Sequence, residues 1–170
     1  MKKSKVLVCF AKHKKWYSNI VLWLTRSKVN HVFVEYYNSF WRKNRAVDID
    51  NTGVCDKPTA SFDSFENLER WECSISLNDS LKQMEGFVGT TKYDWLGMFW
   101  GVIRLFFLRI FGMKINKTIQ SKKRLFCSEF VAEVLKKAGV PGTENWITSD
   151  FSPGDLKKFV ETNECFKRIS

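Results

Sequence analysis

Hydrophobic positions repeat with two different periods along this chain, and the change of period marks the expected strands and helices. Apolar and polar residues alternate through 29–37 and again through 45–50, as is typical of strands. Apolar residues three or four positions apart run through 79–88 and 127–138, as is typical of helices packed on one side. The turn-rich residues 38–44 separate the two alternating segments, so these segments are expected to pair as a hairpin.

Shorter signals add further elements. Residues 5–10 are expected to form a buried strand, and 71–77 is another strand candidate. Helical spacing in 16–25 and a proline near the start of 152–160 indicate two more helices. The chain has 170 residues, 44% of them hydrophobic, and its three prolines are scattered. One domain covering 1–170 is therefore expected.

The most hydrophobic segment, Tyr93–Met113, is long enough to raise the question of a membrane span. Arg104 lies at its centre, and a central arginine costs ~2.5–3.5 kcal/mol, while each Leu, Ile or Phe returns only about 0.3–0.6. The sum lies near zero, which argues against a span. A core helix with one polar stripe and an interfacial membrane helix remain as two interpretations. Because lysines follow directly, Trp95–Met113 and these lysines are a candidate contact for an anionic membrane surface.

Charge and cysteine usage narrow the class of protein. The net charge of +10 favours an anionic partner, although simple solubility explains it as well. No RNA-recognition, zinc-finger or helix-turn-helix signature accompanies the charge, which argues against nucleic-acid recognition. Five cysteines without a CxxC pair, and only two histidines, argue against a metal site and a disulfide framework, and no cofactor is expected. With no signal-peptide pattern, a cytoplasmic location is expected, with peripheral membrane contact left open.

Cys127 is the cysteine best placed for chemistry, because it begins the helix expected at 127–138. A thiol attacks only as a thiolate, which the positive end of a helix and a neighbouring imidazole both favour. The exposed amides of the first turn can also hold an oxyanion. The other four cysteines lie in strand-like or terminal runs without this advantage. The alternative is that Cys127 is a small hydrophobic residue packed at the base of the helix.

His31 is the candidate base, because His13 lies in a basic loop that opposes formation of an imidazolium. A base needs a group that orients it. Asp48 and Asp50 share one face of the strand expected to pair with the His31 strand. Glu35 is a third candidate, two residues from His31 and thus ~6.6 Å away along the strand. Taken alone, a surface histidine explains His31 equally well, and a solvated strand face explains each of the three carboxylates better.

These residues, in this order, resemble the circularly permuted NlpC/P60 papain-like family, which includes YiiX- and YaeF-like amidases. The matching pieces are the run to His31-Val, the Val47-Asp48 strand ending in Gly53-Val54, Tyr93-Asp94, Phe126-Cys127-Ser-Glu-Phe-Val and Pro153-Gly-Asp-Leu156, and they span nearly the whole chain. Each motif is loose, and their order is more specific than any one of them. Asn30 replaces a serine of the family pattern, and Asp48 replaces a glutamate, so Asp50 remains an alternative.

The resemblance implies an α+β fold with a papain-like core in circularly permuted order, the histidine hairpin coming before the cysteine helix. It implies Cys127 as nucleophile, His31 as base and Asp48 as the orienting carboxylate. It also implies hydrolysis or transfer at an amide, thioester or ester carbonyl, on a peptide, a peptidoglycan-like substrate or a lipid acyl group. The alternative function is a weak or inactive papain-like module that binds an anionic membrane surface through its basic, aromatic face.

Overall fold

The computed structural model describes most of the chain, namely residues 5–13, 19, 22–23, 27–40, 42–50, 52–93, 111 and 124–170. The helix expected at 16–25 and the hydrophobic segment Tyr93–Met113 fall almost entirely outside these residues. The membrane contact expected at Trp95–Met113 falls outside them as well. Among the helices of the described ranges, none is both long enough and apolar enough to span a membrane.

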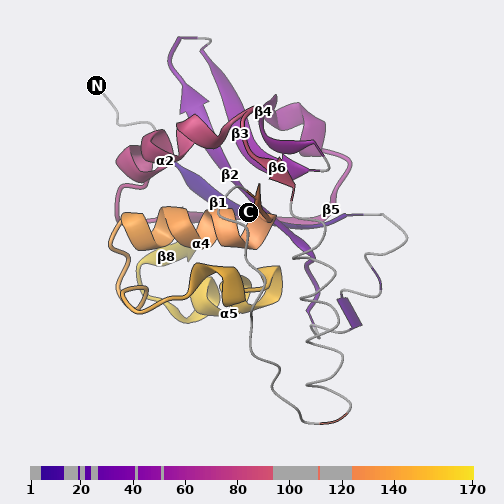
Figure 1. The fold of residues 1–170 in the computed structure, drawn as a ribbon, viewed down its shortest axis with the longest axis vertical. Helices are drawn as coiled ribbons and strands as arrows, with labels where there is room; N and C mark the ends of the chain where they lie inside the picture. Colours follow the sequence, from indigo (N-terminus) through magenta and orange to yellow (C-terminus); the bar gives the residue numbers. More distant parts are fainter. Residues whose placement is uncertain are drawn as a thin grey trace.

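The described residues form a mixed α/β structure around a six-stranded antiparallel sheet (Figure 1). In spatial order the strands are β4 (Gly53–Pro58), β3 (Lys43–Asp50), β2 (His31–Asn38), β1 (Leu7–Lys12), β5 (Glu66–Cys73) and β8 (Phe166–Arg168). A separate parallel pair joins β6 (Lys92–Tyr93) to β7 (Arg124–Leu125). The short helices are α2 (Asn78–Met84), η1 (Thr59–Phe62), η2 (Glu85–Phe87) and η3 (Thr148–Asp150).

The predicted hairpin is confirmed as β2 and β3, which pair antiparallel with Val34 opposite Val47. Val32 and Val34 face the main core, as their alternation predicted. The opposite face of β2 is buried too, and is therefore not the solvated strand face that the sequence left open as an alternative. Phe33 on that face stacks on Phe62 of η1, with ring centroids 4.2 Å apart, and the two belong to a second, smaller core. Strand β2 is therefore covered on both faces.

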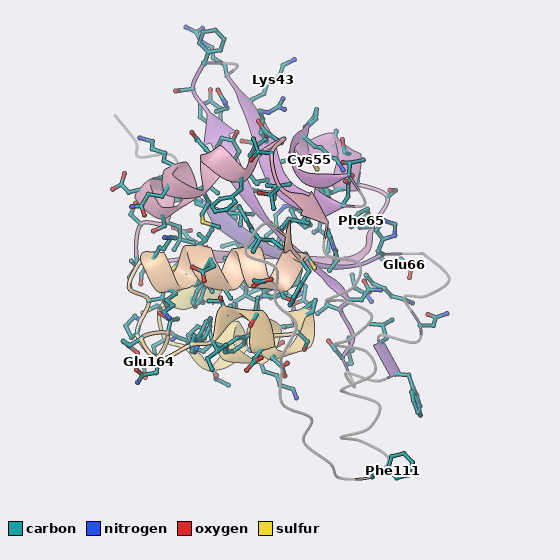
Figure 2. All side chains as sticks on the ribbon, in the orientation of Figure 1. Lys43, Cys55, Phe65, Glu66, Phe111 and Glu164 are labelled. Carbon is teal, nitrogen blue, oxygen red and sulfur yellow. The ribbon has the colours of Figure 1, made fainter. Side chains whose placement is uncertain are left out.

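The cysteine-bearing helix is confirmed as α4 (Cys127–Lys137). Its apolar stripe, including Phe130 and Val134, is buried against the sheet. Figure 1 shows α4 across the sheet between α2 and α5, and side chains crowd the space between these layers in Figure 2. The chain turns away after the helix at Gly139, whose φ of +68° is a left-handed conformation that glycine adopts without strain.

The proline-initiated helix is confirmed as α5 (Pro153–Thr162). Ser152 caps it: its hydroxyl accepts from the Asp155 amide, while the Asp155 carboxylate accepts from the Ser152 amide. This reciprocal pair satisfies two backbone groups that would otherwise lack partners at the helix start. Gly154 follows closely, and a Cβ at this position would lie 2.6 Å from the Ser27 Cβ. The glycine therefore lets α5 approach the residues that lead into β2.

Other boundaries differ from the sequence prediction. The strand expected at 71–77 lies earlier, as β5, and residues 74–77 are not part of it. The helix expected at 79–88 divides into α2 and η2, and α2 begins earlier than expected, with Leu77 at the cap position. Strands β4 and β8 were not predicted. Both lie at the edges of the sheet, where a strand needs no continuous apolar alternation.

Candidate functional site

Cys127 is the first residue of α4 and is partly exposed. The extended Phe126 precedes it, and the helix hydrogen bonds begin when the Phe130 amide donates to the Phe126 carbonyl. The first turn is anchored from the side by Ser128, whose hydroxyl donates to the Phe151 carbonyl at 2.6 Å. The thiol is therefore held at a rigid helix start with the amides of the first turn around it.

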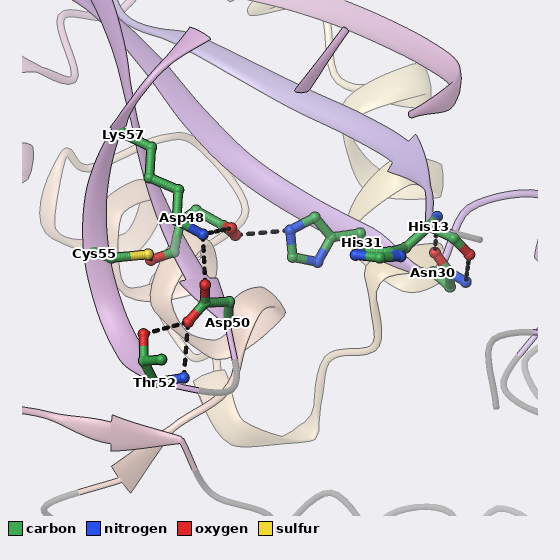
Figure 3. A network of polar contacts seen from close by, with 8 residues as sticks. All are labelled: His13, Asn30, His31, Asp48, Asp50, Thr52, Cys55 and Lys57. Atoms are coloured by element: carbon green, nitrogen blue, oxygen red, sulfur yellow. Dashed lines mark hydrogen bonds and ion pairs between the residues drawn. The ribbon is translucent and has the colours of Figure 1, made fainter. Parts of the chain in front are cut away.

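His31 and Asp48 form a buried hydrogen bond across the β2–β3 hairpin (Figure 3). The imidazole Nε2 donates to the carboxylate Oδ1 over 2.7 Å, and the two residues are only 9% and 3% exposed. Val34 lies opposite Val47, so both His31 and Asp48 lie beyond this pair toward the same end of the hairpin. The hydrogen bond fixes the ring orientation and leaves Nδ1 for a second partner.

The electrostatics of His31 identify that second partner. Burial by itself lowers the pKa of the imidazole, but the charge and hydrogen bond of Asp48 outweigh it. A side-chain hydrogen bond and the charge of Cys127 act in the same direction, and the pKa rises from 6.5 to about 10. The Cys127 side chain is therefore close enough to His31 to interact with it, and together with Asp48 it leaves the imidazole protonated at neutral pH.

The two alternative carboxylates have other partners. Asp50 accepts hydrogen bonds from Thr52 and Lys57, which outweigh the effect of burial and lower its pKa to about 2. Glu35 forms a two-pronged pair with Arg70, whose Nε and Nη2 lie 2.9 and 3.1 Å from the carboxylate oxygens. Of the three carboxylates considered from the sequence, Asp48 is the one that the structure places on His31.

Lys57 of β4 belongs to this cluster and was not foreseen. It donates to Asp50 Oδ2, and its Nζ also lies 3.7 Å from Asp48 Oδ2, the oxygen that His31 does not use. Burial raises the pKa of the Asp48 carboxyl, but the interactions with His31 and the charge of Lys57 lower it below its usual value. Since Lys57 lies opposite Ala46 in the β3–β4 ladder, recognising it required knowing that β4 exists.

Three phenylalanines, Phe33, Phe62 and Phe65, pack together next to His31 and are called the aromatic wall below. The ring centroids of Phe33 and Phe65 lie 6.0 and 5.7 Å from that of His31. His13 lies nearby as well, 6.3 Å from the His31 centroid, and its backbone is bonded to the Asn30 side chain. Because these rings exclude water, the His31–Asp48 pair interacts in a medium of low polarity.

The comparisons with known proteins concern the fold. No family model matches the chain, and no curated protein matches it in sequence. The chain is similar in structure to the crystal structure of the metalloprotein YiiX from Escherichia coli O157:H7, with a TM-score of 0.54 and 13% sequence identity. The match covers 100% of this chain and 98% of the YiiX chain. The chain has a YiiX-like fold.

Some carboxylate and thiol groups of this chain lie close enough together to be considered as metal ligands. One group of candidate ligands occurs among the residues that the structure describes: oxygen atoms of Asp48 and Asp50 and the sulfur of Cys55, all within 4.8 Å of one another. The Lys57 ammonium already contacts both carboxylates, and Asp48 also accepts from His31. The two carboxylates and the thiol therefore fit the ammonium group of Lys57 better than a metal ion.

The raised pKa of His31 predicts that stability falls as the pH rises. The pKa of His31 is 6.5 in the unfolded chain and about 10 in the folded protein. Between these two pH values the folded state holds a proton that the unfolded chain has released. The free energy of unfolding should fall by up to about 1.4 kcal/mol per pH unit from pH 6.5 to about 8.5, where unfolded cysteines begin to titrate. Urea unfolding of the Cys127→Ala variant at a series of pH values measures this slope, because in this variant no thiolate at position 127 offsets the proton on His31. The His31→Asn variant should have a flatter slope, and an equal slope would contradict the assignment.

Proposed function

We propose that this chain is a cysteine hydrolase or acyltransferase with a circularly permuted papain-like NlpC/P60 core. Cys127 is the nucleophile, His31 the general base and acid, and Asp48 the carboxylate that orients it. One arrangement supports the proposal: His31 is hydrogen-bonded to Asp48, and the Cys127 side chain is close enough to interact with the same imidazole. A thiol, an imidazole and a carboxylate in this order are the parts that covalent catalysis at a carbonyl requires.

The first half of the reaction forms an acyl-enzyme. His31, which is protonated at neutral pH, stabilises the thiolate of Cys127 through its charge once the thiol has given up its proton. The thiolate attacks the carbonyl carbon, and the oxyanion that develops is stabilised by the amides at the start of α4. His31 then gives its proton to the leaving amine, thiol or alcohol, and the thioester to Cys127 remains.

The second half releases the acyl group. Neutral His31 takes a proton from water, or from an acceptor alcohol or amine, which attacks the thioester carbonyl. The bond to sulfur breaks, and the thiolate and imidazolium return. Asp48 accepts from Nε2 throughout, so Nδ1 stays directed to the reacting groups. The substrates that fit this chemistry are peptides, peptidoglycan-like amides and lipid acyl esters or thioesters.

Alkylation by iodoacetamide at pH 7 tests the reactive cysteine, with each of the five cysteines followed by peptide mass spectrometry. Cys127 should be labelled at least about tenfold faster than Cys165, a matched control that is also partly exposed, because a thiolate and not a thiol is the nucleophile. The His31→Asn variant should reduce the rate at Cys127 and leave the rate at Cys165 unchanged.

A panel of amide, thioester and ester substrates tests turnover, with the Cys127→Ala variant as the blank. Hydrolysis that depends on both Cys127 and His31 supports the proposal. The proposal is wrong if Cys127 and Cys165 react equally fast. It is also wrong if all hydrolysis survives in the Cys127→Ala and His31→Asn variants.

A further inference from the structure

Lys57 and Asp50 lie on the far side of Asp48 from His31. Figure 3 shows Lys57 extending from β4 toward the two carboxylates, with Asp48 between it and the imidazole. The two oxygens of Asp48 are divided between them: Oδ1 accepts from His31 at 2.7 Å, and Oδ2 lies 3.7 Å from Lys57 Nζ. Asp50 holds the ammonium in place through Oδ2, and is itself held by the Thr52 amide and hydroxyl.

The charges of this cluster balance. Asp48 and Asp50 contribute two negative charges, Lys57 contributes one positive charge, and the remaining negative charge faces the protonated His31. Asp48 is only 3% exposed, so a second uncompensated carboxylate beside it would be costly. Lys57 therefore does more here than an ordinary surface ion pair, which contributes little.

We propose that Lys57, held by Asp50, is a positioning residue that fixes the Asp48 carboxylate against His31 and limits the negative charge that His31 experiences. This inference rests on the proposed function for its catalytic meaning, although its physical content is independent of turnover. Lys57 restrains Oδ2, so Oδ1 stays in line with the Nε2–H bond. Because Lys57 also pairs with Asp50, its positive charge offsets the negative charge of Asp48 only in part.

The titratable groups around His31 come from four elements. Asp48 and Asp50 project from β3, Lys57 and Cys55 from β4, and Cys127 from α4. His13 follows β1 and lies edge-on to the imidazole. Lys57 and Asp50 carry opposite charges on the far side of Asp48. Removing them one at a time should therefore shift the pKa of His31 in opposite directions.

NMR titration of the His31 ring tests the charge balance directly, in a Cys127→Ala background so that activity is not needed. Lys57→Met leaves two negative charges and should raise the pKa of His31. Asp50→Asn lets Lys57 neutralise Asp48 and should lower it, each by about half a pH unit or more. The double variant restores the original net charge and should return the pKa close to its starting value.

The Nε2–H proton resonance of His31 tests the positioning. It should stay sharp in Lys57→Arg, which keeps a cation in place, and broaden in Lys57→Met as Asp48 gains freedom. Lys157→Met is the matched control, since it removes an ammonium that lies 2.6 Å from Glu69 on another part of the sheet. Shifts of the same sign in both single variants, or no shift in either, would overturn the inference.

Kinetics separate this inference from the proposed function. If Cys127 turns over a substrate, the alkaline limb of the pH profile of kcat/KM should move up in Lys57→Met and down in Asp50→Asn, and Lys57→Arg should rescue the rate. If Cys127 proves unreactive, the proposed function fails, while the NMR shifts still decide the role of Lys57.

Discussion

Replacing Asp48 with asparagine should reduce kcat/KM by about 10³–10⁴-fold, with little change in the fold. The amide keeps the shape of the side chain but removes the charge that outweighs the burial of His31. The pKa of His31 then falls, because burial favours the neutral imidazole. At neutral pH the thiolate and imidazolium no longer form together, and the ring is free to rotate. The iodoacetamide reaction at Cys127 should slow in parallel.

Asp56→Asn is the matched control for this substitution. Asp56, like Asp48, accepts from side chains of neighbouring strands, here from Tyr36 at 3.0 Å and Arg45 at 2.8 Å, but on another part of the β3–β4 ladder. This variant should change the labelling rate of Cys127 by less than about twofold. Equal effects of the two substitutions would mean that Asp48 acts on stability and not on His31. Circular dichroism of both variants distinguishes these cases.

Replacing Phe130 with alanine should destabilise the fold by about 3–5 kcal/mol. Phe130 lies one turn after Cys127 on α4, is 1% exposed and packs in the main core. Removing its ring leaves a cavity between α4 and the sheet, and neighbouring side chains fill such a cavity only in part. Urea unfolding measures the loss, and the midpoint should fall with no change in the slope.

Phe40→Ala provides the comparison, because Phe40 is 82% exposed at the turn between β2 and β3. The same substitution should change the free energy of unfolding there by less than about 0.5 kcal/mol. Similar losses at both positions would contradict the packing described for α4. If Phe130→Ala lowers the stability, it should also slow the labelling of Cys127, since α4 sets the position of the sulfur relative to β2.

Local periodicity was enough to predict the elements that carry the site. The β2–β3 hairpin and α4 were recognised from alternation and from helical spacing, and both were confirmed. Strand β4 was missed because Gly53–Pro58 contains two charged residues and a proline, and because its partner β3 is what makes it a strand. Since Lys57 lies on β4, missing the strand meant missing the residue.

The choice among the three carboxylates could not be made from the strand pattern, and only the family resemblance implied Asp48. Asp48 and Asp50 share one face of a strand, and alternation alone cannot separate them. The partners that decide the matter come from elsewhere: Lys57 from the next strand for Asp50, and Arg70 from β5 for Glu35. The aromatic wall was missed for the same reason, since Phe62 and Phe65 reach Phe33 and His31, respectively, only when the chain after β4 folds over β2.

The parallel pairing of β6 with β7 has a consequence for how this protein can diversify. Tyr93 lies opposite Leu125, which comes two residues before Cys127, so the described residues on either side of 94–123 are held side by side near this cysteine. When the two ends of a segment are fixed side by side, doubling its length costs only about 0.6 kcal/mol in closure entropy. Insertions, deletions or exchanges between these two points would therefore leave the six-stranded sheet and the His31–Asp48 pair intact. Evolution can thus vary the chain between Tyr93 and Leu125 independently of the scaffold that holds these two residues.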